Sequence, residues 1–255
     1  MQLEMTTSLR CLASTPLNNS IQNERDIVKN LFITVPETTL PSGLVVPAFQ
    51  YGQFACSKGA GGKAVITEDG TPWVRISFEE AKAACVDIGG QLVTERQELA
   101  IRLNAAQQDC NWTKGKVGEG KLFRGLRKGN VSSAQPGTFQ SPDAKERRWL
   151  TLSNGEKVCD LNGNVFSWIF DDVQGNDLGL TTIIKADSPS LTTAPYPSQE
   201  KGMGWRPDGE RNWSGRALVR GGCWGSGSDA GVFYLVYFGP GYRHDRIGFR
   251  CTKSL

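Results

Sequence analysis

The sequence predicts an α+β fold in which two helices pack on small antiparallel sheets with long loop insertions. Three observations support this class. The two clearest helical segments lie close together, between residues 77 and 103. The 255 residues include 30 glycines and 12 prolines, which favour turns over long regular elements. The long remainder of the chain consists of short strand-like runs between turn residues, as in antiparallel sheets.

Residues 1–43 are expected to form a separate N-terminal extension. They contain a short helical candidate at residues 21–32, followed by the turn-forming sequence PETTLPSG. The extension has no apolar run of about 7 to 15 residues, so we expect no secretory signal or lipoprotein anchor. No run of about 18 apolar residues occurs in the chain, so we expect no membrane span.

Residues 44–255 are expected to form one domain. It begins with the strand-like segment LVVPAFQYGQF, and SKGAGGKAVITEDGTPW places glycine turns around a second strand. The first helix starts with the capping box of Ser77 to Glu80 and stops at Gly89-Gly90, and the same capping pattern at Thr94 opens a second helix. The expected apolar faces consist of Ala81, Ala84, Cys85 and Ile88 in the first helix, and of Leu99, Ile101 and Leu103 in the second.

The charge balance argues against nucleic acid as a partner. The formal net charge is only +3. Two short basic clusters occur, and we interpret them as solvated loops because Glu146 lies within the second. The first cluster contains Arg124, Arg127 and Lys128, and the second contains Lys145, Arg147 and Arg148.

The cysteines and the single histidine do not form a metal-binding pattern. The seven cysteines are widely spread without a C-x-x-C pair, and His244 is the only histidine, whereas zinc sites use clustered cysteine and histidine. His244 and Asp245 are adjacent, so we expect their side chains to point apart and not to form a Ser-His-Asp site.

Four motifs follow one another along the chain: PWVRISFEEAKAACVDIGGQLVTERQE, DLNGNVFSW, ALVRGGCW and IGFRC. This ordered set resembles the formylglycine-generating-enzyme branch of the C-type lectin fold, over roughly residues 44–255. The resemblance implies that RGG and GFR are strands near the centre of the domain and that the segment between them is an exposed face. It also implies a disulfide between Cys85 and Cys251.

The same resemblance raises an alternative, a divergent oxidase of the formylglycine-generating kind. It implies catalytic cysteines at positions 226 and 231, which are Ser226 and Gly231 here. Thiol redox chemistry needs the thiolate, and Cys223 has no resolving partner in its segment. One histidine cannot build the iron site of sulfoxide-synthase relatives. We therefore expect no enzyme activity and no cofactor.

A fixed calcium-dependent lectin is the third alternative, because one stretch of the chain is rich in side-chain oxygens. The competing interpretation, which we favour, is that Asn162-Gly163-Asn164 makes a tight turn, Trp168 fills the core and the aspartates are solvated. The oxygen-bearing residues concerned are Asp160, Asn162, Asn164, Asp171 and Asp172.

Residues 223–246 contain no lysine, glutamate, glutamine or methionine. Randomising the adenines of asparagine codons gives NNY codons, which encode none of these four residues and also exclude tryptophan and stop. Trp224 would then belong to the fixed scaffold. The same absence extends from Arg211 to Thr252, and glycine-rich β structure is poor in some of these residues anyway, so the codon pattern supports diversification without requiring it.

The pattern from RGG to IGFRC is also similar to the variable proteins of diversity-generating retroelements, in which error-prone reverse transcription rewrites codons at fixed positions. The resemblance implies a fixed frame of Arg220, Gly221, Gly222, Trp224, Gly227, Ala230, Gly231, Val232, Phe233, Leu235, Pro240, Ile247, Gly248, Phe249 and Arg250. The implied variable, ligand-binding positions are Cys223, Gly225, Ser226, Asp229, Tyr234, Val236, Phe238, Tyr242, Arg243, His244, Asp245 and Arg246. Tyr234, Tyr237 and Ser228 fit either set.

We therefore expect a ligand-binding protein that recognises a protein or surface structure on a host or neighbouring cell. Three of the five tyrosines fall in the segment, beside Arg243 and Arg246, and binding surfaces favour both residue types. The competing interpretation is ordinary aromatic packing between strands and turns. A phage or viral attachment protein, carried on the particle and docked through residues 1–43, is the expected setting.

Overall fold

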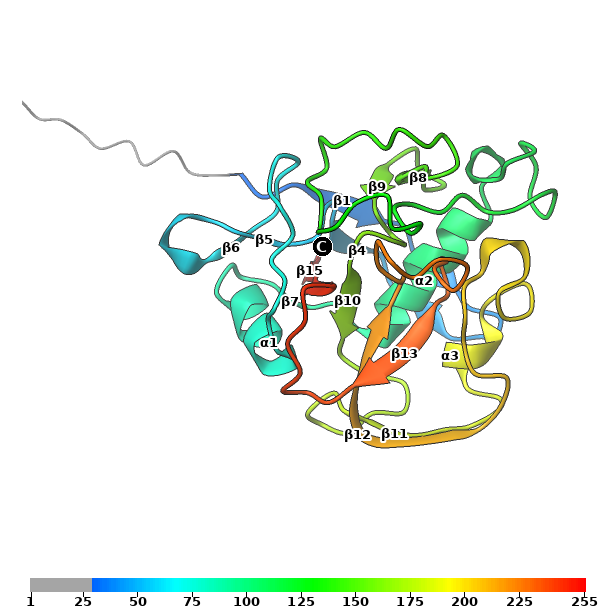
Figure 1. Cartoon of the computed structure of the whole chain (residues 1–255). Helices are drawn as coiled ribbons and strands as arrows, with labels where there is room; N and C mark the ends of the chain where they lie inside the picture. Colours follow the sequence, from blue (N-terminus) through cyan, green and yellow to red (C-terminus); the bar gives the residue numbers. More distant parts are fainter. Residues whose placement is uncertain (1–28) are drawn as a thin grey trace, which may run out of the picture.

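The structure is a computed structural model and describes residues 29–255 (Figure 1). One four-stranded antiparallel sheet has the order β1-β4-β15-β7. Its strands are β1 (Phe32–Val35), β4 (Phe49–Gly52), β15 (Cys251–Ser254) and β7 (Gln91–Leu92). The last strand of the chain thus lies beside β4, near the start of the domain.

The second sheet has the order β11-β12-β10-β14, and β13 pairs with β12. Its strands are β10 (Phe166–Ile169), β11 (Thr181–Ile184), β12 (Arg211–Arg220), β13 (Leu235–Phe238) and β14 (Ile247–Phe249). All pairs are antiparallel except β10 with β14. The RGG motif ends β12 and the IGF residues form β14, on either side of the central β10, so both motifs lie in or beside central strands, as expected.

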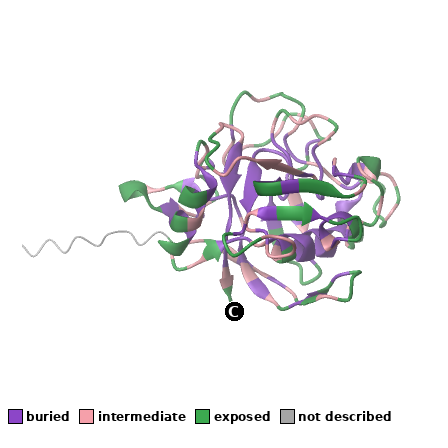
Figure 2. Ribbon diagram, turned by 90° about the horizontal axis from the view of Figure 1, so that it is seen from below, coloured by how far each residue is buried: buried purple, intermediate pink, exposed green. Residues whose placement is uncertain are grey.

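Three two-stranded antiparallel sheets complete the described β structure. They are β2 (Thr38–Thr39) with β3 (Val45–Val46), β5 (Ser57–Lys58) with β6 (Ala64–Val65), and β8 (Trp149–Thr151) with β9 (Lys157–Cys159). The small sheets, together with the long loop that precedes β8, confirm the predicted α+β class. Figure 2 shows buried residues in the interior and exposed residues mainly along loops and outer edges.

Both predicted helices are present. α1 (Phe78–Val86) has Ser77 as its N-cap and α2 (Glu95–Ala106) has Thr94, each with a complete capping box. A third, four-residue helix, α3 (Pro189–Thr192), was not predicted. No helix within residues 29–255 has the length and apolarity needed to cross a membrane.

The N-terminal boundary of the domain lies earlier than expected. Phe32, the end of the helical candidate, begins β1 instead, and residues 32–35 pair with β4. The strand forms because Ile33 and Val35 alternate into the core while their neighbours stay partly exposed. The described part of the expected extension therefore contributes to the domain, and the rest of it lies outside the described residues.

α2 is buried around most of its circumference, including three charged side chains. Glu98 accepts hydrogen bonds from Arg102 Nε at 2.6 Å and from the Tyr51 hydroxyl at 2.8 Å. Glu95 accepts one from Arg220 Nε at 2.7 Å, so the arginine of RGG holds α2 against β12. Buried charges of this kind persist only when they are paired and hydrogen-bonded.

The structure contains the disulfide between Cys85 and Cys251 that the resemblance implied, with the two Cα atoms 5.4 Å apart. It joins α1 to β15 across 166 positions of the chain. Closing so long a loop restricts the unfolded chain strongly, so the bond contributes to stability. Cys56 Sγ lies 3.4 Å from Cys251 Sγ.

Replacing Cys251 with alanine should lower the free energy of unfolding by about 2–5 kcal/mol. Cys251 is the better choice because Cys56 is close enough to bond with it if Cys85 alone were replaced. Urea unfolding of the oxidised protein measures the loss, and Cys110→Ala, at an exposed free cysteine, is the control. Equal urea midpoints for the two variants would show that the disulfide contributes nothing.

Candidate ligand-binding face

The frame expected around the variable segment is largely buried. Of its fifteen residues only Trp224, Gly227 and Pro240 are partly exposed. Two of its glycines are required by close packing, because a Cβ on Gly222 would lie 2.9 Å from Ala230 and one on Gly231 would lie 2.2 Å from a backbone nitrogen. These contacts fix the path of the chain between β12 and β13, which Figure 1 shows in orange.

The candidate variable positions lie, with one exception, at the surface. All except Cys223 are partly or fully exposed. Cys223 is 2% exposed and packs in the core, with its sulfur 3.2 Å from the Ser226 hydroxyl oxygen. The side chain is buried just after the chain leaves β12, so Cys223 can meet a ligand only from within the hollow described next. We call the surface formed by the other candidate positions, from Gly225 to Arg246, the candidate face.

Seven of the twelve candidate positions meet at one hollow of about 290 Å³. Phe166 of β10 and Ile247 of β14 complete its lining. The candidate residues in it are Cys223, Ser226, Tyr234, Phe238, Tyr242, His244 and Arg246. The loop before β13 and the loop after it thus form one site, which sequence spacing alone could not show.

Three rings that line this hollow stack on one another. The Phe238 and Tyr242 rings have centroids 5.0 Å apart at 14°, and Tyr242 and His244 continue the stack at 5.8 Å and 19°. Burial, then the charges of Asp229 and Cys223, raise the pKa of Tyr234 to about 12. Tyr234 is therefore a neutral hydroxyl at physiological pH, able to donate and to accept hydrogen bonds.

Charged side chains also belong to the candidate face. The Arg246 guanidinium lies 4.3 Å from the centre of the Trp224 ring. His244 Nδ1 and Asp245 Oδ1 are 2.8 Å apart, so our expectation that these neighbours point apart was wrong. Both side chains are about two-fifths exposed, and no hydroxyl among residues 29–255 forms a hydrogen bond with His244, so a Ser-His-Asp arrangement is not formed there.

Arg243 crosses to α1 and binds Glu80 through two hydrogen bonds of 3.0 and 2.8 Å. These bonds, followed by those from Ser77, lower the pKa of Glu80 to about 2. Because the folded-state pKa is depressed, the pair contributes its stabilisation above the ordinary pKa of 4.5 and loses it as the pH falls towards 2.

Arg243→Ala should raise the pKa of Glu80 from about 2 towards its ordinary value but leave it below 4.5, since the bonds from Ser77 remain. A carbon-detected NMR titration of the Glu80 carboxyl measures this pKa. Lys185→Ala, whose lysine pairs with Glu210 instead, is the control and should leave the pKa near 2. An unchanged pKa in Arg243→Ala would show that Arg243 does not hold Glu80 in solution.

The oxygen-rich segment considered for calcium uses its oxygens within the protein. Asn162 Oδ1 accepts from the Gly125 amide and Asn164 Oδ1 from the Gln135 amide, both at 2.9 Å. Asn164 has a positive φ of 60°, as a tight turn requires, and Trp168 is fully buried. Both features confirm the turn interpretation. The expected solvation of the aspartates was wrong, because Asp171 is buried and accepts a hydrogen bond from Thr181 at 2.7 Å.

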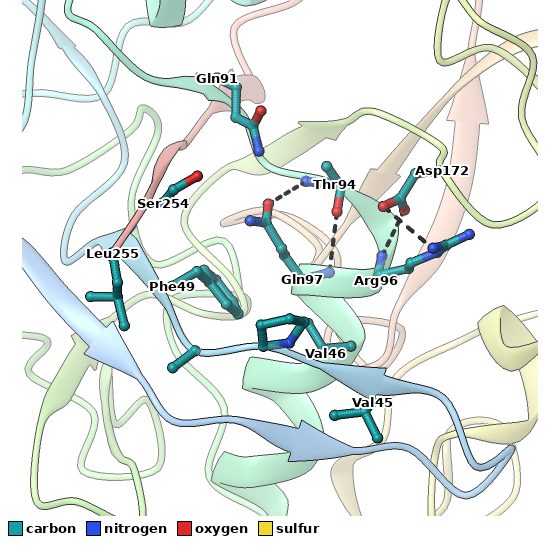
Figure 3. Close-up of a pocket in the computed structure, with 12 residues that line it drawn as sticks. Val45, Val46, Phe49, Gln91, Thr94, Arg96, Gln97, Asp172, Ser254 and Leu255 are labelled. Atoms are coloured by element: carbon teal, nitrogen blue, oxygen red, sulfur yellow. Dashed lines mark hydrogen bonds and ion pairs between the residues drawn. The ribbon is translucent and has the colours of Figure 1, made fainter.

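Among residues 29–255, no group of three or more His, Cys, Asp and Glu side chains could hold a metal ion. A larger cavity of about 420 Å³ lies outside the candidate face, between β3, the start of α2 and the C-terminal strand (Figure 3). Its polar groups bind one another: Gln97 N donates to Thr94 Oγ1 and Arg96 N to Asp172 Oδ1. These groups are thus occupied by hydrogen bonds at the start of α2. The hollow on the candidate face remains the better candidate for a ligand-binding site.

The fold and the exposed loops define an α+β domain that presents one face between β12 and β14. The family described as "Sulfatase-modifying factor enzyme 1-like domain" matches residues 48–255. The chain belongs to this family, which confirms the resemblance to the formylglycine-generating-enzyme branch. No curated protein matches the sequence significantly.

Several solved structures are similar. The Major Tropism Determinant M1 variant is 14% identical with a TM-score of 0.41, over 86% of this chain and 52% of that one. Variable protein 1 of Treponema denticola is 15% identical with a TM-score of 0.48, over 89% and 93%. CarF is 12% identical with a TM-score of 0.46, over 90% and 100%. The chain spans about half the length of the Major Tropism Determinant structures.

Proposed function

We propose that this protein binds a ligand through the candidate face and that a retroelement diversifies this face at the candidate positions. One observation carries the proposal: between Arg220 and Arg250 the expected frame is largely buried, whereas the expected variable positions other than Cys223 are exposed and most meet at one hollow. The names of two structures reported above, a determinant in several variants and a variable protein, describe proteins that vary. The exposure pattern is what supports the proposal for this chain.

The scaffold suits a surface that changes. Exposed substitutions away from special contacts usually alter stability by about 0.5 kcal/mol or less, whereas buried ones cost several times more. Arg220 and Arg250 hold the two ends of the segment inside the protein: Arg220 donates to Glu95, and Arg250 donates to the Gly52 carbonyl at 2.9 Å. Because these anchors do not involve the candidate positions, the binding residues can change without loss of the fold.

The candidate face suits a protein or another structured surface as ligand. It combines stacked aromatic rings with Arg243, Arg246 and a neutral Tyr234 hydroxyl. Rigid aromatic rings supply contact area at small entropic cost, and arginine supplies directional hydrogen bonds. We place the protein on a phage or viral particle, where several copies would strengthen weak single-site binding through avidity. Immunogold labelling of purified particles tests this setting, and unlabelled particles would contradict it.

We further propose that the chain is not an enzyme, although the name of its family describes an enzyme-like domain. Ser226 and Gly231 occupy the positions expected for catalytic cysteines. Cys223 is buried, and its sulfur contacts Ser226 rather than another cysteine. The family match is the observation that favours an oxidase. An assay of peptide cysteine oxidation that gave product with the wild-type protein, and none with Cys223→Ser, would support the oxidase instead.

Sequencing this gene from many individuals of the source population tests the proposed diversification. Substitutions should concentrate at the candidate positions between residues 225 and 246 and use NNY codons. The buried frame codons in the same segment are the internal control and should remain constant. Equal variation in frame and candidate codons, or low variation in both, would overturn the proposal.

A further inference from the structure

The two basic clusters, which we interpreted as solvated loops, meet at one pocket of about 320 Å³. A backbone bridge between Arg124 and Glu146 brings the two segments together. The pocket is lined by four cationic side chains, those of Lys121, Arg124, Arg127 and Lys145. Arg148 of the second cluster is not part of it, because this residue is buried in an ion pair with Asp160. The expected solvation was therefore wrong for Arg148, whereas Lys128, Lys145 and Arg147 are exposed as expected.

The pocket has no carboxylate in its lining. Within residues 29–255, none of its four cations lies within 4.0 Å of a carboxylate oxygen. The acidic groups of the second segment bind elsewhere. Glu146 is buried and accepts hydrogen bonds from the amides of Arg127 and Lys128, each at 2.8 Å, and Asp143 pairs with the Lys128 ammonium.

The two arginines are held in place without a counter-ion. Arg124 donates to the Ser228 carbonyl at 3.1 Å and Arg127 to the Gly227 carbonyl at 3.3 Å, so both contact the loop that carries candidate positions. Burial, then the charge of Arg127, lower the pKa of Arg124 to about 10. Arg127 Nε is buried and has no hydrogen-bond partner within residues 29–255. A bound anion would stabilise the charged form of Arg124 and could accept a hydrogen bond from Arg127 Nε.

One wall of the pocket is aromatic. The half-buried Phe123 ring lines it, and the Arg147 guanidinium lies 4.5 Å from the centre of that ring. Arginine and lysine together recognise phosphate and sulfate oxygens, arginine through paired donors and lysine as a point charge. The volume of about 320 Å³ leaves room for the small group that carries such an anion.

We propose that this pocket binds an oxyanion of the phosphate or sulfate type, carried on the ligand or on a small molecule. The residues that line it lie outside the candidate positions, so every diversified form of the protein would keep the site. The inference does not depend on diversification, because the lining residues lie between 113 and 145 and the loop groups that hold the two arginines are backbone carbonyls. If the proposed function also holds, the pocket would supply a constant anionic contact beside a changing face.

The test is calorimetric titration of the whole protein with inorganic phosphate and, separately, with inorganic sulfate, each at constant ionic strength made up with chloride. Lys121→Gln together with Lys145→Gln removes two exposed cations and should weaken binding about tenfold or more. Lys128→Gln is the matched control, because this exposed lysine is a neighbour in sequence but does not line the pocket. Circular dichroism confirms that all variants are folded.

Saturable binding of either anion that is lost in the double variant and kept in Lys128→Gln would establish the site. The anion that binds with the higher affinity, phosphate or sulfate, would be identified as the preferred ligand of the pocket. Absence of saturable heat with both anions would overturn the proposal, and so would equal weakening in Lys128→Gln and the double variant. Neither of these results would alter the codon variation that tests the proposed function.

Discussion

Replacing Glu95 with alanine should lower the free energy of unfolding by about 3–5 kcal/mol, because the variant leaves the Arg220 guanidinium buried without its carboxylate. Both side chains are fully buried, so solvent does not screen their interaction. Arg220 would keep only its bonds to the carbonyls of Phe233 and Ser190, at 3.3 and 3.2 Å. Urea denaturation followed by circular dichroism measures the loss.

Glu210→Ala is the control, since this glutamate forms an exposed pair with Lys185 and should cost about 1 kcal/mol or less. The double variant Glu95→Leu with Arg220→Met should recover much of the stability, because it removes both charges together. If Glu95→Ala unfolded at the same urea concentration as Glu210→Ala, the buried pair would not anchor the frame in the way described.

Phe249→Ala should cost about 3–5 kcal/mol, whereas Tyr242→Ala should cost about 1 kcal/mol. Phe249 is fully buried in β14, and its ring contacts Trp73 with centroids 5.9 Å apart. Tyr242 is 42% exposed and stacks only on Phe238 and His244 among the aromatic rings described. The two substitutions remove similar rings, so the difference between their losses in unfolding free energy measures the effect of burial.

This contrast is measured by the urea midpoints of the two variants at pH 7. It tests the division of the segment into a frame that folds the domain and a face that does not. A loss in Tyr242→Ala as large as that in Phe249→Ala would show that the candidate face belongs to the core, and the segment would then be ordinary aromatic packing between strands.

Local signals in the sequence predicted the helices accurately because capping depends on a few neighbouring residues. Ser77 and Thr94 cap α1 and α2 as expected. The sequence did not reveal that Glu95 and Glu98 are buried, because their partners include Arg220 and Tyr51, which are distant in the chain. The error at Phe32 has a related cause: residues 32–35 favour a strand, but the pairing with β4 that starts β1 at Phe32 is not visible in the local sequence.

The candidate site was predictable in composition but not in shape. The division into frame and candidate residues came from the motifs, and burial follows it except at Cys223, which is buried, and at three partly exposed frame residues, Trp224, Gly227 and Pro240. The hollow depends on Phe166 lying beside Ile247, a pairing of β10 with β14 that sequence spacing did not indicate. Likewise the cationic pocket joins Arg124 to Lys145 through a bridge that no local pattern indicates.

The position of β15 has a consequence for the order in which the chain folds. β15 pairs with β4, placing Thr252 beside Tyr51, and it also pairs with β7. Contacts between residues so far apart in sequence form late, because the intervening chain must first be ordered. A chain interrupted anywhere between residues 223 and 246 would lack both β14 and β15, leaving β4 paired with β1 alone and β10 paired with β12 alone. We expect such products to remain unfolded and to be degraded, so that folding of the domain depends on translation through β15.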